Sequence, residues 1–144
     1  MIAGVDEVGR GCIAGPVVAA AVILQANIEG IKDSKKLSVK KRNELSELIK
    51  SNSIYSFGMS SSDEIDELNI QNATFLAMQR AVKNLSVQPK KILVDGNQVF
   101  ETNLPIEAIV GGDNLITSIS AASIIAKVYS CLLYTSDAAD DIPR

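Results

Sequence analysis

The sequence predicts an α/β protein, a sheet flanked by helices, and three observations support this class. The segment Val17–Leu24 is a continuous apolar run of strand length, which is typical of a strand buried on both faces. Segments with a helical spacing of apolar residues, such as 39–50, alternate with strand-like ones. The chain of 144 residues is long enough to bury one core. These features together indicate a single α/β sandwich.

Five segments have the length and composition of strands. In the third, Tyr55, Phe57 and Met59 recur at every second position, so we expect them on one side of a strand. The fourth is apolar and leads directly into Asp95-Gly96. We therefore expect a five-stranded sheet with strands at Ile2–Val8, Val17–Leu24, 54–60, Lys91–Asp95 and 106–110.

Helical signals fill the segments between these strands. Ser38 is a suitable N-cap for a helix over 39–50. A second helical region begins at Ser62 or Asp63, and we expect a break in it near Asn69. The sequence Gly-Gly-Asp at 111–113 is expected to cap a last helix, from 114 to about 129, whose many Ala and Ser residues permit close packing on the sheet.

Composition excludes several kinds of active site. The chain has no histidine, which removes histidine bases, Ser-His and Cys-His nucleophile pairs and histidine-bound zinc. Tryptophan is absent and aromatic residues make up only 4% of the chain, so an aromatic surface that stacks single-stranded nucleic acid is not expected. Acid–base chemistry must come from carboxylates, Lys, Tyr or metal-bound water.

The same composition bears on location and assembly. Cys12 and Cys131 lack the spacing of a metal site or of a disulfide framework, which favours a reducing compartment. No apolar run is long enough to span a bilayer, and no charged segment precedes 14–24 as it would in a signal peptide. We expect a cytoplasmic protein with no membrane contact. Nothing in the sequence indicates an oligomer, so we expect a monomer.

Acidic residues at the ends of two predicted strands form the most informative pattern. Asp6 and Glu7 lie near the end of an apolar strand, where two negative charges are unfavourable unless a cation neutralises them. Asp95 ends another strand. If the two strands are neighbours, the three carboxylates can meet at the sheet edge where α/β proteins bind ligands. Adjacent residues of a regular strand point to opposite faces, so Asp6 and Glu7 share a site only if the strand distorts or ends there.

Carboxylate oxygens are the ligands that Mg²⁺ and Mn²⁺ prefer. Two such ions, about 3.5–4 Å apart, can activate water and stabilise the leaving oxygen of a phosphoryl displacement. Considered alone, Asp95-Gly96 is more typical of a turn. The alternative that all three acids are solvated turn residues of an ordinary α/β domain therefore stays open at this point.

Glycines and cations near the acid pair indicate a phosphate ligand. Gly9 and Gly11 leave backbone N–H groups accessible, and Arg10 between them carries a forked donor suited to phosphate. A cluster of cations follows, which by itself is more typical of a solvated helix face: Lys32, Lys35, Lys36, Lys40, Lys41 and Arg42. Beside a metal site, this cluster favours attraction of phosphate, despite a net charge of −3.

Five motifs, in order along residues 1–129, resemble ribonuclease HII, the bacterial type 2 ribonuclease H. The related ribonuclease HIII usually lacks an arginine between the two glycines, so Arg10 favours HII. The motifs are Asp6-Glu7-Val8-Gly9-Arg10-Gly11, Asp33-Ser34-Lys35-Lys36-Leu37, Ile65-Asp66-Glu67-Leu68-Asn69-Ile70, Leu93-Val94-Asp95-Gly96-Asn97 and Ser120-Ala121-Ala122-Ser123-Ile124-Ile125-Ala126-Lys127-Val128.

The resemblance implies a ribonuclease H-like fold with a mixed sheet. It implies an endonuclease that uses two Mg²⁺ or Mn²⁺ ions to hydrolyse RNA in RNA–DNA hybrids. The same enzyme would nick duplex DNA on the 5′ side of embedded ribonucleotides, leaving a 3′-hydroxyl and a 5′-phosphate. Such cleavage belongs to ribonucleotide excision repair and DNA replication.

The resemblance also assigns roles to residues. Asp6, Glu7 and Asp95 match the catalytic, metal-binding carboxylates of the family. Gly9, Arg10 and Gly11 match the segment that senses the ribose 2′-hydroxyl, the group that distinguishes RNA from DNA. Lys35 and Lys36 match a basic segment near the scissile backbone. The alternative in another class is a non-catalytic nucleic-acid-binding homologue, but a binder has no need of converging carboxylates.

The chain departs from the family pattern near its C-terminus. The resemblance implies a fourth metal-binding Asp at a position that Cys131 occupies in this chain. The sulfur of cysteine is a soft ligand that suits Mg²⁺ poorly. The segment 131–141 resembles translated sequencing-library adapter. We therefore expect a catalytic domain over 1–129, incomplete at its C-terminus, a non-native tail over 130–144, and impaired activity. A divergent native terminus is the alternative, with the missing ligand supplied by Asp137, Asp140 or Asp141.

Overall fold

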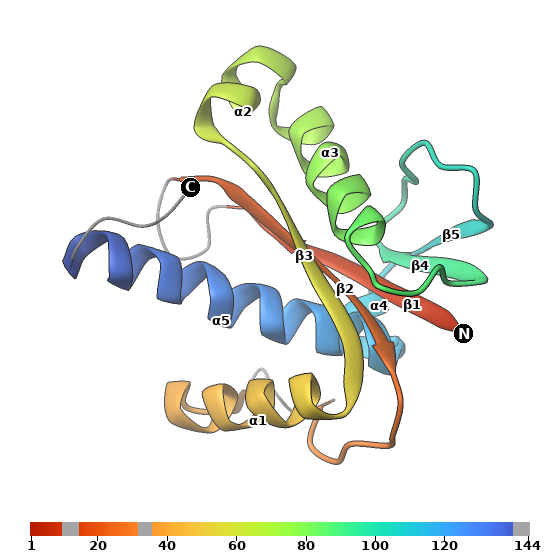
Figure 1. Cartoon of the computed structure of the whole chain (residues 1–144), viewed down its shortest axis with the longest axis vertical. Helices are drawn as coiled ribbons and strands as arrows, with labels where there is room; N and C mark the ends of the chain where they lie inside the picture. Colours follow the sequence, from red (N-terminus) through yellow and green to blue (C-terminus); the bar gives the residue numbers. More distant parts are fainter. Residues whose placement is uncertain (10–14, 32–35, 140–144) are drawn as a thin grey trace.

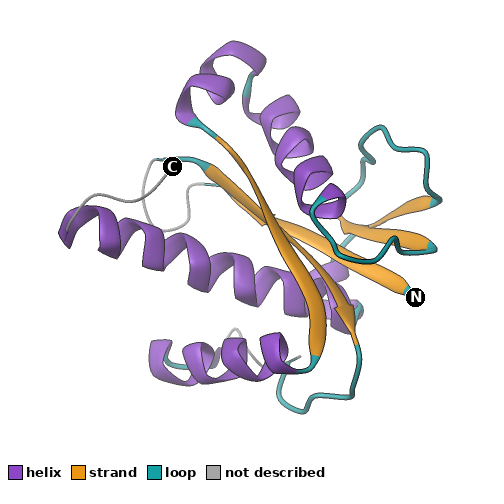
Figure 2. Ribbon diagram, in the orientation of Figure 1, coloured by secondary structure: helices purple, strands orange, loops and turns teal. Residues whose placement is uncertain are grey.

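The structure contains one mixed sheet of five strands, in the order β3-β2-β1-β4-β5 (Figures 1 and 2). The computed structural model describes residues 1–9, 15–31 and 36–139, the last six by their backbone only. The strands are β1 (Ile2–Val8), β2 (Val17–Leu24), β3 (Ser53–Ser60), β4 (Lys91–Asp95) and β5 (Ile106–Ile109). β2 pairs antiparallel with β1 and β3, whereas β4 pairs parallel with β1 and β5. The predicted mixed α/β sheet is confirmed.

Helices cover both faces of this sheet. Figure 1 shows α1 (Val39–Ser51) and the long α5 (Thr117–Ala139) on one face, and α3 (Ile70–Lys83) on the other. The short α2 (Ser62–Leu68) precedes α3 at the end of the molecule. The core consequently has two halves, one beneath α3 and one beneath α1 and α5.

The position of β2 in the sheet explains why its sequence is apolar throughout. Alternate side chains of a strand point to opposite faces of the sheet. Val17, Ala19 and Ala21 enter the core half beneath α3, and the residues between them enter the half beneath α1 and α5. A strand covered on both faces therefore has no solvent side on which a polar residue is favourable.

Two local signals act as the sequence predicts. The Ser38 hydroxyl accepts a hydrogen bond from the backbone N–H of Lys41 at 3.2 Å and so caps α1. Asn69 lies in the left-handed region, with φ of 71°, and separates α2 from α3. Asparagine tolerates this conformation better than most residues, which is why the break falls there.

The last helical region differs from the prediction. A one-turn helix, α4 (Gly112–Leu115), follows Gly111, and Ile116 is extended before α5 begins. Gly111 has φ of 71°, a conformation that glycine adopts without strain, and it starts the turn earlier than expected. The prediction that Asp113 caps one helix from 114 is therefore wrong, because Asp113 lies inside α4.

Gly4 allows α5 to pack directly against β1. A Cβ atom on Gly4 would lie 2.3 Å from the carbonyl carbon of Ser118 and 2.4 Å from the nitrogen of Ile119, both backbone atoms. Any side chain at this position would push the first turn of α5 away from the sheet. Gly4 thus brings the start of α5 next to the strand that carries Asp6.

Two further observations concern α5 and the helices generally. Cys131 in α5 is disulfide-bonded, contrary to the expectation of no disulfide, and Cys12 lies outside the described residues.

Among the residues that the structure describes, no helix has the length and apolar character needed to cross a membrane.

Candidate metal centre

The first two acids lie side by side where β1 and β4 separate. The parallel register pairs Ile2 with Lys91 and continues to Val5 with Val94. Asp6 and Asp95 are the next residues of their strands, beyond the last pair of the ladder. Since neighbouring parallel strands present equivalent positions on the same face, both side chains lie on the face covered by α4 and α5. The structure thus brings together two of the three predicted carboxylates.

Asp113 is the third member of this acid cluster. One carboxylate oxygen from each of Asp6, Asp95 and Asp113 lies within 4.8 Å of the others. The backbone N–H of Asp113 also donates to Oδ1 of Asp95 at 3.0 Å. Gly112 permits close packing of α4 on α5, because a Cβ there would lie 2.8 Å from Cδ1 of Ile119.

Burial and mutual repulsion make the acid cluster unfavourable without a cation. Asp6 is only 4% exposed. Burial, together with the charges of Glu7, Asp95 and Asp113, raises the pKa of Asp6 to about 8, although a hydrogen bond from the N–H of Glu7 acts in the opposite direction. A bound cation would relieve this repulsion. The donors are all carboxylate oxygens, which fit Mg²⁺ or Mn²⁺.

Glu7 does not enter the group of oxygens within 4.8 Å. β1 continues its regular pairing with β2 through Glu7 and Val8, so the strand neither ends nor distorts at the acid pair. Burial nevertheless raises the pKa of Glu7, and the negative charge of Asp95 adds to the effect. Glu7 therefore lies within the electrostatic influence of the cluster, and its role as a ligand stays a prediction.

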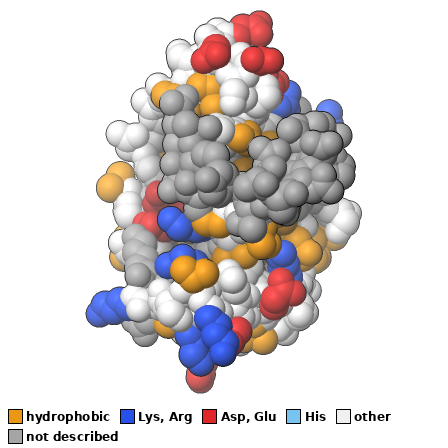
Figure 3. Space-filling view, turned by 90° about the vertical axis from the view of Figure 1, so that its left-hand side faces the viewer, with side chains coloured by type: hydrophobic (Ala, Val, Ile, Leu, Met, Phe, Trp, Pro, Cys, Tyr) orange, Lys and Arg blue, Asp and Glu red, His pale blue; other side chains and the backbone are white. Residues whose placement is uncertain are grey.

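The residues predicted to contact nucleic acid are only partly described. Gly9 directly follows β1 and is half-buried, whereas Lys36 is exposed just before α1. Arg10, Gly11 and Lys35 lie outside the described residues. Figure 3 shows acidic side chains at the end of the molecule where α2 lies and basic side chains towards the opposite end, where α1 lies. The basic side therefore includes the helix that follows Lys36.

Sequence reasoning missed Asp113 because Gly-Gly-Asp resembled a helix cap. A usable signal was present: Asp113 closely follows β5, which is parallel to β4, and carboxyl ends of parallel strands gather at one edge. The expected fourth ligand position, Cys131, lies about 16 Å beyond Ser120 along α5 at 1.5 Å per residue. Asp113, rather than position 131, supplies the additional carboxylate beside Asp6 and Asp95.

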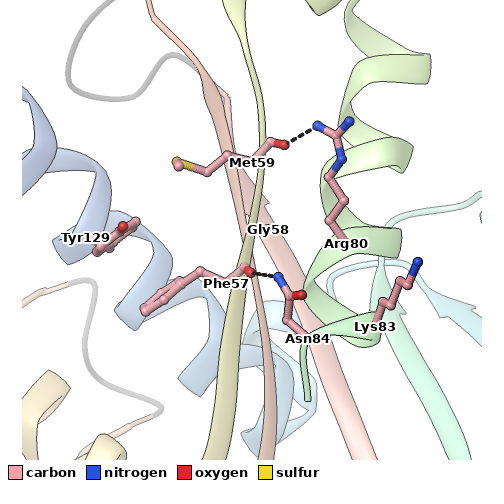
Figure 4. Close-up of a pocket in the computed structure, with 7 residues that line it drawn as sticks. All are labelled: Phe57, Gly58, Met59, Arg80, Lys83, Asn84 and Tyr129. Atoms are coloured by element: carbon pink, nitrogen blue, oxygen red, sulfur yellow. Dashed lines mark hydrogen bonds between the residues drawn. The ribbon is translucent and has the colours of Figure 1, made fainter. Parts of the chain in front are cut away.

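A separate cavity of about 510 Å³ lies at the edge strand β3, between α3 and α5 (Figure 4). Asn84 donates to the carbonyl of Phe57 at 2.8 Å, and Arg80 donates to the carbonyl of Met59 at 2.7 Å. These contacts occupy outward carbonyls of the edge strand. None of the clustered acids lines this cavity, so it is not part of the candidate metal centre.

The mixed five-stranded sheet with helices on both faces is a ribonuclease H-like fold. The sequence model of one family in this class, ribonuclease HII, matches residues 3–141. The chain belongs to the ribonuclease HII family and is a ribonuclease H, an endonuclease of the kind that acts on RNA–DNA hybrids.

Solved structures agree with this assignment. A chain in the PCNA:RNase HII complex from Archaeoglobus fulgidus is 30% identical, with a TM-score of 0.80 over 98% of this chain and 78% of that one. Ribonuclease H2 from Pyrococcus horikoshii OT3 is 30% identical, with a TM-score of 0.79 over 94% and 75%. Bst-RNase HIII in complex with Mn²⁺ is 20% identical, with a TM-score of 0.70 over 95% and 54%, and shares the fold.

Proposed function

We propose that this protein nicks duplex DNA on the 5′ side of embedded ribonucleotides and cleaves the RNA strand of hybrids by a mechanism that uses two divalent cations. The products are a 3′-hydroxyl and a 5′-phosphate. This activity would serve ribonucleotide excision repair and the removal of RNA during replication. The observation that carries the proposal is the acid cluster of Asp6, Asp95 and Asp113 in a chain of the ribonuclease HII family.

The three acids are suited to hold Mg²⁺ or Mn²⁺, with Glu7 as a further ligand. When bound, such ions neutralise charge on the phosphate and favour attack by water. Backbone N–H groups already occupy one oxygen of Asp6 and one of Asp95, at 2.8 and 3.0 Å. These hydrogen bonds hold the carboxylates of Asp6 and Asp95 in place.

We propose that Gly9, Arg10 and Gly11 recognise the ribose 2′-hydroxyl and its phosphate, and that Lys35 and Lys36 contact the backbone nearby. Gly9 supports this assignment by its position, since it lies directly after the strand that carries Asp6. In the proposed reaction, the phosphate that is cleaved at the acids adjoins the ribonucleotide. The segment that recognises the 2′-hydroxyl must therefore lie next to the acids.

The test uses a labelled DNA duplex with one ribonucleotide, incubated with the protein and Mg²⁺ or Mn²⁺. We expect one nick on the 5′ side of the ribonucleotide and none in the all-DNA duplex. Asp6→Asn and Asp95→Asn should abolish the nick while the circular dichroism spectrum stays unchanged. Nicking by Asp95→Asn at the wild-type rate would refute the site, and binding without cleavage by the wild type would identify a non-catalytic homologue.

The expected impairment from Cys131 is tested separately. Because Asp113 completes a cluster of three acids, we propose that cation binding survives in this chain. A Cys131→Asp variant should then show the same Mn²⁺ affinity as Cys131→Ser, which lacks the disulfide as well. A large gain in affinity or nicking rate would instead support the original expectation that position 131 lacks a ligand.

A further inference from the structure

A chain of hydrogen bonds connects α5 to the acid cluster through Ser120. The Ser120 hydroxyl donates to the backbone carbonyl of Asp113. The backbone N–H of Asp113 in turn donates to Oδ1 of Asp95 at 3.0 Å. Ser120 is only 3% exposed, and its hydrogen bond to Asp113 is partly buried. One buried hydroxyl thus joins three elements, α5, α4 and β4.

α4 depends on such contacts because it has little stability of its own. It contains four residues, and an isolated helical turn is unfavourable since few hydrogen bonds offset the fixed backbone. Gly111 provides no side-chain cap, and Leu115 is 63% exposed and adds little burial. The direction in which the Asp113 carboxylate points therefore depends on what holds the α4 backbone from outside.

We propose that Ser120 is a positioning residue for the cation site: its hydroxyl holds the backbone of Asp113 so that the carboxylates of Asp113 and Asp95 face the same point. This inference rests on the proposed function, because it assumes that the acid cluster binds a divalent cation. Residues that hold metal ligands in place typically change metal affinity about 10- to 100-fold when they are removed.

A matched control separates positioning from general stability. The Ser60 hydroxyl is fully buried and donates to the carbonyl of Ala73, so it makes the same kind of bond between β3 and α3. Ser60 is not connected to any of the clustered acids. Removing either hydroxyl should lower stability by a similar amount, but only Ser120 should influence a bound cation.

The experiment measures Mn²⁺ affinity of the full chain by calorimetry and by electron paramagnetic resonance, without nucleic acid. We expect Ser120→Ala to weaken Mn²⁺ binding about tenfold. Ser120→Thr, which keeps the hydroxyl, should retain most of the affinity. Ser60→Ala should bind Mn²⁺ as the wild type does, even where its melting temperature falls.

Each outcome decides between named alternatives. Wild-type affinity in Ser120→Ala, or an equal loss in Ser60→Ala, would overturn the positioning role and leave the proposed function standing. A wild type whose Mn²⁺ binding is absent, or is unaffected by Asp95→Asn, would overturn the proposed function and the positioning role with it. If Ser120→Ala does not fold, Ser120→Cys keeps the volume with a weaker donor, and wild-type affinity there would also refute the role.

Discussion

Asp113 is the residue whose role depends most on its immediate surroundings. Its backbone N–H donates to Asp95 and its carboxylate lies in the acid cluster. In the proposed cation site, Asp113 would therefore be a ligand and would also hold the ligand Asp95 in place. Asparagine at this position would keep the backbone contact and the side-chain size but remove the charge. The substitution therefore isolates the electrostatic part of the role.

We expect Asp113→Asn to reduce both Mn²⁺ affinity and nicking by about 100-fold, because a ligand charge contributes several kcal/mol to a divalent site. Affinity is measured by calorimetry and nicking on the single-ribonucleotide duplex. Asp66→Asn, an exposed acid of α2, is the control and should change neither. Normal nicking by Asp113→Asn would remove this residue from the site.

At the scale of elements, the contact between β1 and α5 determines whether the acids and Ser120 can meet. Gly4 lies two positions before Asp6 on the same face of β1, and the backbone of α5 occupies the space that a side chain would need. Backbone atoms cannot rotate away as the end of a side chain can. The start of α5 is therefore close to the acid cluster only because position 4 is glycine.

We predict that Gly4→Ala destabilises the protein by about 1–3 kcal/mol, the usual effect of overpacking a core, and weakens Mn²⁺ binding. Denaturant unfolding and calorimetry measure the two effects. Gly9→Ala is a matched stability control, since a Cβ there would meet nothing within 4 Å. Equal stability of the two variants would contradict the close packing of α5 on β1.

The second contact between elements is an ion pair that joins α2 to α3. Arg80 donates to both carboxylate oxygens of Glu64, at 2.8 and 2.7 Å, and also to the carbonyl of Met59. These hydrogen bonds, chiefly the pair from Arg80, lower the pKa of Glu64 from 4.5 to about 2. A carboxylate whose pKa is lower in the folded protein stabilises the fold when the pH is above the pKa of the group in the unfolded chain. This stabilisation is lost as the pH falls towards the pKa of the group in the folded protein.

The prediction is that Glu64→Gln melts at a lower temperature than the wild type at pH 6, and that the difference shrinks as pH falls from about 4.5 to about 2. Glutamine retains the capping contact with Ser61, so the comparison removes only the charge. Melting curves at several pH values provide the test. A difference that does not depend on pH would show that the ion pair contributes nothing.

On the scale of the whole molecule, charged side chains are unevenly distributed over the face shown in Figure 3. Figure 3 shows acids at the α2 end and basic side chains towards α1. Some α1 cations pair with acids of the same helix, as Lys41 does with Glu44 at 3.8 Å. Such exposed pairs contribute little. For the proposed function, we expect a polyanionic duplex to approach the end where α1 lies.

We expect Lys36→Ala to weaken binding of hybrid and all-DNA duplexes alike and to lower the slope of log affinity against log salt by about 1. Fluorescence anisotropy at several salt concentrations measures this. Lys83→Ala, on α3 beside the edge-strand cavity, is the control and should leave the slope unchanged. A selective loss for hybrid duplexes would instead indicate that Lys36 senses RNA.

Arg10 is expected to act differently from Lys36, because it is predicted to sense the ribonucleotide. Arg10→Ala should reduce the preference for the ribonucleotide junction over all-DNA duplex, while general binding changes less. Competition between the two duplexes measures the preference. An unchanged preference would exclude Arg10 from this role.

α5 continues past residue 129 to Ala139, and the family match extends to residue 141. The domain boundary at residue 129 stays a prediction. That the tail over 130–144 is not native stays a prediction. Sequencing the source locus tests it: a native reading frame through Asp141 would refute it.

By itself, the sequence determined the elements and the kind of chemistry. The uninterrupted apolar run of β2, the cap at Ser38 and the break at Asn69 are local effects, so neighbouring residues are sufficient to predict them. The acids at the ends of two strands indicated a cation site for the same reason. Which strands are neighbours is not a local property. From the sequence, the meeting of the acids could be predicted only on the assumption that their two strands are adjacent.

Only the tertiary structure decided which acids meet. The parallel register of β1 and β4 places Asp6 beside Asp95, while the regular course of β1 leaves Glu7 outside the closest group. Asp113 joins the cluster because Gly111 turns the chain early and Ser120 holds α4 from a different helix. Asp6 is distant in sequence from Asp95, and Asp95 from Asp113, so a pattern of neighbouring residues does not specify that these acids meet.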